Sequence, residues 1–111
     1  MHDWVKEFPG AITTCDRDAI VREMNDKATS VFVKDGGEKL IGHSLYDCHN
    51  PRSIEIIKSM LETGENNIYT IEKNGKKKLI IQQPYYTEGK VAGLVELSIE
   101  LPREIPHYVR T

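Results

Sequence analysis

Residues 67–83, NIYTIEKNGKKKLIIQQ, decide the fold of this chain. The dipeptide Asn74-Gly75 at their centre is the strongest short signal for a β-hairpin. A two-residue loop pairs Lys73 with Lys76 and so sets the register of both strands. The pairs that follow are Glu72 with Lys77, Thr70 with Leu79, and Ile68 with Ile81. The sequence therefore predicts two antiparallel strands in a fixed register.

The alternation of a strand divides the side chains of this hairpin between two faces. One face carries Ile68, Thr70, Leu79, Ile81 and Gln83, and the other carries Tyr69, Ile71, Lys78, Ile80 and Gln82. We predict that the first face points into the protein, because it is apolar apart from Thr70, Gln83 and the charged pair at the tip. The second face is less polar than a fully solvated one, so we expect that something covers part of it.

Three further strands are predicted. After a turn at Glu88-Gly89, apolar residues alternate with polar ones up to Glu100, which is typical of a half-buried strand. Residues 11–15 and 20–24 read as a second hairpin, joined across a polar turn at residues 16–18.

Helix signals fill the middle of the chain. Asn25 or Asp26 can cap a helix whose apolar residues include Ala28 and Phe32. Asn50-Pro51 begins a longer helix, which Gly64 ends. The order of elements predicts an α+β fold with a five-stranded antiparallel sheet and short helices packed on one face. We expect a flanking helix at residues 1–9, a domain at residues 10–101 and a C-terminal tail at residues 102–111.

Composition restricts the function classes. The 111 residues suffice for one domain, and the formal net charge of −2 gives no overall field that would attract nucleic acid. No apolar run is long enough to span a bilayer, and residues 1–10 lack the layout of a signal peptide, so we expect a cytoplasmic protein with no membrane partner. Cys15 and Cys48 match neither a disulfide framework nor a zinc spacing.

The sequence resembles a PAS domain, a family of sensory domains, over roughly residues 10–101. The resemblance is carried by residues 11–25 (AITTCDRDAIVREMN), the helix at residues 27–33, the segment Leu40-Ile41-Gly42 and residues 89–100 (GKVAGLVELSIE). Within these segments, Asp16 matches the frequent aspartate of the family's first hairpin, and Asn25 matches the asparagine before its first core helix. Residues 48–53 (CHNPRS) are also similar to a segment of PAS domains attached to a bacterial domain of unknown function, DUF438.

This resemblance implies a non-catalytic sensory module. PAS domains bind a small ligand or cofactor between the sheet and the helices and pass the change to a partner or output domain, for example in transcription regulation. We therefore expect no catalytic residue and a mostly apolar pocket. The expected lining is Phe32, Tyr46, Cys48, His49, Ile57, Leu79, Ile81 and Leu97.

Two cofactors occur in such domains, and the sequence assigns neither. A haem-binding sensor would need an axial ligand, for which His49 is the candidate, with Cys48 as a second ligand. A histidine at a helix entry also serves simply to bond a nearby carbonyl group. Flavin photochemistry needs a cysteine just after the Leu40-Ile41-Gly42 turn, where this chain has none. No spacing of histidines and cysteines predicts another metal site.

The alternative from a different functional class is a protein-interaction scaffold with a filled core and no ligand. Trp4, Val5 and Phe8 lie on one side of a short N-terminal helix that cannot be stable alone in water. In this alternative, these residues and the outer face of the sheet form the interface of a homodimer.

Overall fold

The computed structural model describes residues 2–47 and 49–111, and its centre is an antiparallel sheet of five strands in the order β2-β1-β5-β4-β3. The strands are β1 (Ala11–Asp16), β2 (Val21–Met24), β3 (Asn67–Lys73), β4 (Lys76–Thr87) and β5 (Lys90–Glu100). The helices are α1 (Asp3–Lys6), α2 (Asp26–Val31) and α3 (Pro51–Thr63), with the single 3-10 turns η1 (Val33–Asp35), η2 (Gly37–Leu40) and η3 (Leu45–Asp47). This architecture confirms the predicted α+β fold.

The predicted hairpin register is confirmed. Lys73 pairs with Lys76 and Ile68 pairs with Ile81, and both residues of the loop have positive φ, at 54° for Asn74 and 76° for Gly75. The register continues across the next strand, where β5 places Leu97 opposite Ile81.

The predicted orientation of the hairpin is wrong. Ile80 is 6% exposed beneath the helices, whereas Ile68 is 54% exposed on the opposite face. The loop length determines which residues pair but says nothing about which face receives the helices. Leu79, Ile81 and Leu97 share the outer face with Ile68, so they do not line the interior.

Asn25 connects the N-terminal segment to the domain. Its side-chain oxygen accepts hydrogen bonds from the backbone N–H groups of Ile12 (2.9 Å) and Ala28 (3.0 Å), so Asn25, one of the two predicted candidates, caps α2. Its amide nitrogen donates to the carbonyl oxygens of Gly10 (2.8 Å) and Val5 (3.1 Å). One buried side chain therefore satisfies backbone groups of α1, β1 and α2.

Asp16 organises the turn between β1 and β2. Its carboxylate accepts hydrogen bonds from the N–H groups of Asp18 and Ile20 and forms an ion pair with Arg22. Burial opposes the charge, but the Ile20 N–H and Arg22 hold the pKa of Asp16 below its usual value. The turn also contains Ala19, at a φ of 62°.

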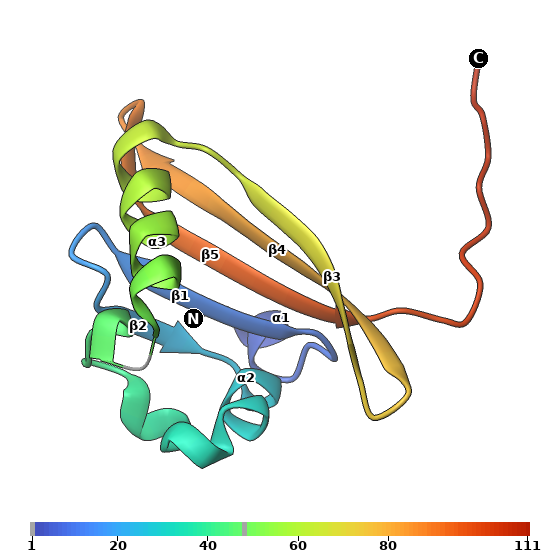
Figure 1. Cartoon of the computed structure of the whole chain (residues 1–111), viewed down its shortest axis with the longest axis horizontal. Helices are drawn as coiled ribbons and strands as arrows, with labels where there is room; N and C mark the ends of the chain where they lie inside the picture. The colour runs from blue at the N-terminus through green and yellow to red at the C-terminus, as the bar shows by residue number, and fades with distance from the viewer. Residues whose placement is uncertain (1, 48) are drawn as a thin grey trace.

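The helices lie on both sides of the sheet. In Figure 1, α3 passes in front of the sheet with α2 below it, while α1 lies behind β1. Asn50 caps α3 by accepting a hydrogen bond from Ser53 N–H at 2.8 Å. The buried residues of α3 are Ile57, Met60 and Leu61, which pack with Cys15, Ala19 and Leu94.

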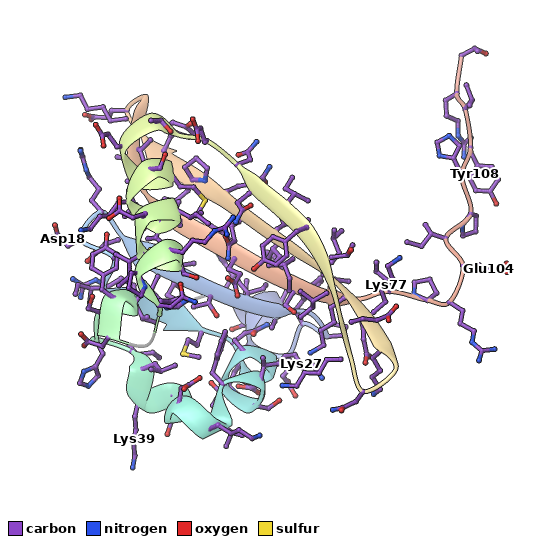
Figure 2. All side chains as sticks on the ribbon, in the orientation of Figure 1. Asp18, Lys27, Lys39, Lys77, Glu104 and Tyr108 are labelled. Carbon is purple, nitrogen blue, oxygen red and sulfur yellow. The ribbon has the colours of Figure 1, made fainter. Side chains whose placement is uncertain are left out.

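Residues 102–111 contain no helix or strand and extend away from the sheet (Figures 1 and 2). In Figure 2, Glu104 and Tyr108 stand on this tail, well separated from the helices. Among the described residues, no helix combines the length and the apolar character that a bilayer span requires.

Candidate functional site: a cleft between the sheet and the helices

The deep end of the site is a small apolar cavity of about 60 Å³ under α3. Its apolar lining includes Cys15, Val21, Met24, Leu40, Leu45, Met60 and Leu94. Burial raises the pKa of the Cys15 thiol to about 11, so this cysteine is neutral at pH 7 and is not an activated nucleophile. This cavity has room for an apolar group but not for a whole organic ligand.

A wider cleft of about 580 Å³ lies beside the cavity, between α2, α3 and the strands β3, β4 and β5. Phe32, His49, Ile57, Gln82 and Glu96 line both spaces, so they mark the junction between them. The volume of the cleft is in the range of small-molecule sites.

A row of polar side chains crosses the floor of the cleft. Asn67 on β3 donates to Gln82 on β4 at 2.9 Å, and Gln82 donates to Glu96 on β5 at 2.7 Å. The strand register sets this row, because Gln82 pairs with both Asn67 and Glu96. The hydrogen bonds fix the orientation of the Gln82 amide and direct its donor toward the Glu96 carboxyl group.

His49 borders this row just before α3. Its Nδ1 lies 2.7 Å from the carbonyl oxygen of Leu45, which can only accept, so Nδ1 carries a proton. Burial raises the pKa of the Glu96 carboxyl group, and the hydrogen bond from Gln82 and the charge of His49 oppose this shift. The carboxyl group of Glu96 is therefore held in an environment that disfavours its charged form.

The cleft is bordered by cationic side chains. Arg52 lies in the first turn of α3, and Lys73 and Lys78 belong to β3 and β4. The ion pairs among the described residues are Lys6–Asp26, Asp16–Arg22 and Lys76–Glu100. Within this part of the chain, no carboxylate is therefore within ion-pair distance of the three cations.

The structure brings together three of the residues expected to line the pocket. Phe32, His49 and Ile57 line the cleft. Tyr46 instead packs beside the core of Cys15, Ile57 and Leu94, with Lys58 Nζ 5.5 Å from its ring centroid. Cys48 lies outside the described residues. Leu79, Ile81 and Leu97 are on the outer face, because the hairpin turns its Ile80 side toward the helices.

Sequence reasoning missed the polar floor. Asn67, Tyr69, Gln82 and Glu96 all line the cleft, but the inverted assignment of the hairpin placed Tyr69 and Gln82 outside. A signal was available in Glu96, a carboxylate in the middle of an otherwise half-buried strand. A charged residue at such a position often marks a site.

The raised pKa of Glu96 gives a prediction about pH. Glu96→Gln keeps an acceptor for Gln82 and removes a charge that burial disfavours, so the variant should be more stable than the wild type at pH 7, by about 1 kcal/mol. A raised pKa in the folded state means that the folded wild type binds the proton more tightly. The stabilising contribution of the protonated group is thus complete below the ordinary glutamate value of 4.5 and is lost as pH rises through the folded pKa.

The measurement is urea denaturation of both proteins between pH 3.5 and 8. The advantage of the variant should be near zero at the acid end and grow as pH rises. Glu100→Gln is the control of opposite sign, because a hydrogen bond from Lys76 lowers the pKa of Glu100. A constant difference between Glu96→Gln and wild type over this pH range would contradict the prediction.

The chain matches no protein-family model and no curated protein. It is similar to several solved structures. The C-terminal domain of a protein from Streptococcus mutans has a TM-score of 0.70 and 20% identity, with 86% of this chain and 78% of that one covered. The PAS domain of the histidine kinase ThkA has a TM-score of 0.65 and 21% identity, with coverages of 81% and 97%.

A third similar structure is the Aer2 receptor from Vibrio cholerae, described as a dual PAS-heme oxygen sensor. Its TM-score is 0.61 at 11% identity, with 84% of this chain and 95% of that one covered. Identities this low show the fold alone. The chain has a PAS-like fold, which confirms the resemblance seen in the sequence.

Proposed function

We propose that this chain is a sensory module that binds a small organic molecule in the cleft and passes the change to a partner or output domain. The observation that carries the proposal is the cleft itself, which combines apolar walls with an oriented polar floor. Such a combination is typical of ligand sites. The PAS-like fold supports the proposal, since similar structures include the PAS domain of a histidine kinase.

The position of β5 supports a route for the signal. Glu96 and Ser98 on this strand line the cleft, and the strand ends at Glu100, immediately before the extended tail. A ligand that contacts Glu96 therefore acts on the strand that leads out of the domain. We propose that a shift of β5 carries the signal toward whatever the tail contacts.

Haem fits this cleft poorly. His49 supplies an imidazole, but the Glu96 carboxyl group and the amides of Gln82 and Asn67 would lie against an apolar macrocycle. We therefore favour a smaller ligand with its own polar groups over the haem that is named for the Aer2 receptor.

The test is native mass spectrometry and absorbance of the purified protein, with two variants of neighbouring residues. Gln82→Phe should fill the cleft and abolish the bound mass, because Gln82 lies on its floor. Gln83→Phe, the same change on the opposite, exposed side of β4, should retain it. The proposal is contradicted if the wild-type protein carries no small molecule, or if folded Gln82→Phe retains as much of it as the wild type does. A Soret band in the absorbance spectrum would instead identify the bound molecule as haem.

The outer face supports a second proposal, that two copies of the chain associate through it. Ile68, Leu79, Ile81, Leu97 and Ile99 form an apolar surface on the side of the sheet away from α3. Phe8 continues this surface, because its ring reaches the space above Gly10 beside Ile99. Trp4 packs edge-on against Phe8 and is 66% exposed. Contiguous exposed apolar surface of this kind is typical of an interface.

Ile68→Glu is expected to convert the proposed dimer to a monomer, because it places a charge on the exposed β3 part of the proposed contact. Sedimentation equilibrium measures the dissociation constant, which should rise by at least about tenfold, equivalent to 1.4 kcal/mol. Val33→Glu is the matched control, since Val33 is 68% exposed on η1 and far from this face. A wild-type monomer at high concentration, or equal effects of the two changes, would rule the interface out.

A further inference from the structure

The charges that border the cleft are unequally distributed between its two ends. Arg52, Lys73 and Lys78 line only the wide outer part, whereas Glu96, the single acid among the lining residues that the structure describes, lies at the junction with the deep cavity. The outer part also contains Asn50 and Ser53 at the N-terminal end of the 13-residue helix α3, where the helix dipole favours negative charge.

The floor between the cations of the sheet and the polar row is apolar. On β4, Ile80 lies between Lys78 and Gln82 on the same face of the strand, and Phe32 and Ile57 line the cleft from the helical side. At the inner end, the Gln82 amide donates to Oε2 of Glu96, which leaves Oε1 of that carboxylate as a further acceptor. The outer part of the cleft thus carries an excess of positive charge, with Glu100 opposite Lys78 as a neighbouring acid, and the inner end accepts a hydrogen bond.

We infer that the ligand is an organic monocarboxylate with a compact apolar body and a hydrogen-bond donor at its far end. Its carboxylate lies among Arg52, Lys73 and Lys78, and its donor, a hydroxyl or similar group, faces Glu96. Arg52 is the expected main partner, because a guanidinium group binds a carboxylate through two parallel hydrogen bonds. This inference rests on the proposed function and names the class of molecule that the same cleft takes.

Four probe compounds separate the parts of this inference. 4-Hydroxyphenylacetate has all three features, and 4-methoxyphenylacetate lacks only the donor. 4-Hydroxyphenylethanol has a neutral group in place of the carboxylate, and tyramine has a cation there. Titration of the full chain, followed by amide NMR shifts at Ile80 and Ser98, gives the affinity and locates the probe in the cleft.

4-Hydroxyphenylacetate is expected to bind at least about tenfold more tightly than the neutral alcohol, and tyramine is expected to bind most weakly. The methoxy compound should also bind more weakly than the hydroxy compound. The preference for the carboxylate should shrink as salt is raised, because the cations are partly open to solvent.

Two variants test the assignment of the cationic end. Arg52→Gln should weaken the binding of 4-hydroxyphenylacetate about tenfold and leave the affinity for the neutral alcohol unchanged. Arg103→Gln, the same change on the exposed tail, should alter neither. Lys78→Gln provides a second site for the same measurement, should Arg52→Gln fail to fold.

Tightest binding of tyramine, equal binding of the acid and the alcohol, or no shift at the cleft residues with any probe would overturn the inference. Equal binding of the hydroxy and methoxy acids would overturn the assignment of the donor to Glu96. The proposed function fails separately, since it depends on a small molecule that copurifies with the protein. If a small molecule copurifies with the protein but neither acid binds in the cleft, the proposed function is supported and the assignment of the ligand as a carboxylate is wrong.

Discussion

Gly93→Ala is expected to lower the free energy of unfolding by about 3 kcal/mol or more, close to the upper end for an overpacked site. A Cβ at this position would overlap the backbone carbonyl oxygen of Cys15 and lie 2.6 Å from Oη of Tyr85. Tyr85 crosses here to donate a hydrogen bond to the same Cys15 oxygen at 3.1 Å. Relief of the clash requires β1 to separate from β5, which breaks the centre of the sheet.

The measurement is urea denaturation monitored by circular dichroism, with Gly89→Ala as the control. A Cβ added at Gly89 would have no neighbouring atom within 4 Å, and the φ of 79° makes alanine strained by only about 1–2 kcal/mol. The prediction therefore separates steric exclusion from backbone strain. If Gly93→Ala were no more destabilising than Gly89→Ala, the close approach of β1 to β5 at this point would be wrong.

Asn25→Ala is expected to lower the free energy of unfolding by about 3–4 kcal/mol, an effect comparable to that of Gly93→Ala. The side chain is 1% exposed, and its removal leaves the buried N–H groups of Ile12 and Ala28 and the Gly10 carbonyl without a partner. Each such group carries a desolvation cost of its own, although the costs do not add fully.

Asn50→Ala is the matched control, because both residues cap a helix. Asn50 is exposed, and its side chain bonds only the Ser53 N–H among the described residues, so Asn50→Ala should lower the free energy of unfolding by about 1 kcal/mol. Thermal and urea unfolding of both variants measure the difference. Similar values for the two would show that Asn25 acts as a helix cap alone and does not hold the N-terminal segment in place.

The sequence was sufficient to predict the elements and the pairing of the hairpin. Asn74-Gly75 specified the turn, and the turn specified every pair from Lys73 to Ile68, because a two-residue loop allows one register. Asn25 and Asn50 located the two helix starts through their ability to accept a backbone hydrogen bond.

The orientation of the hairpin and the floor of the cleft were not predicted, and one cause explains both. A face with Ile80 and Gln82 is nearly as apolar as one with Leu79 and Ile81, so composition does not decide which of them receives α3. That choice depends on long-range packing of Ile57 and Met60 against Leu94, which no local pattern contains. Because the face was inverted, the polar row through Gln82 was assigned to the wrong side.

The alternation of β5 has a consequence for how such a protein can change over generations. Leu94, Glu96 and Ser98 face the helices, whereas Leu97 and Ile99 face away from them. Since neighbouring positions between Glu96 and Ile99 serve separate surfaces, mutations at Glu96 and Ser98 can retune what the interior admits while Leu97 and Ile99 preserve the exterior. Selection can therefore act on the two surfaces independently, although a single strand carries both.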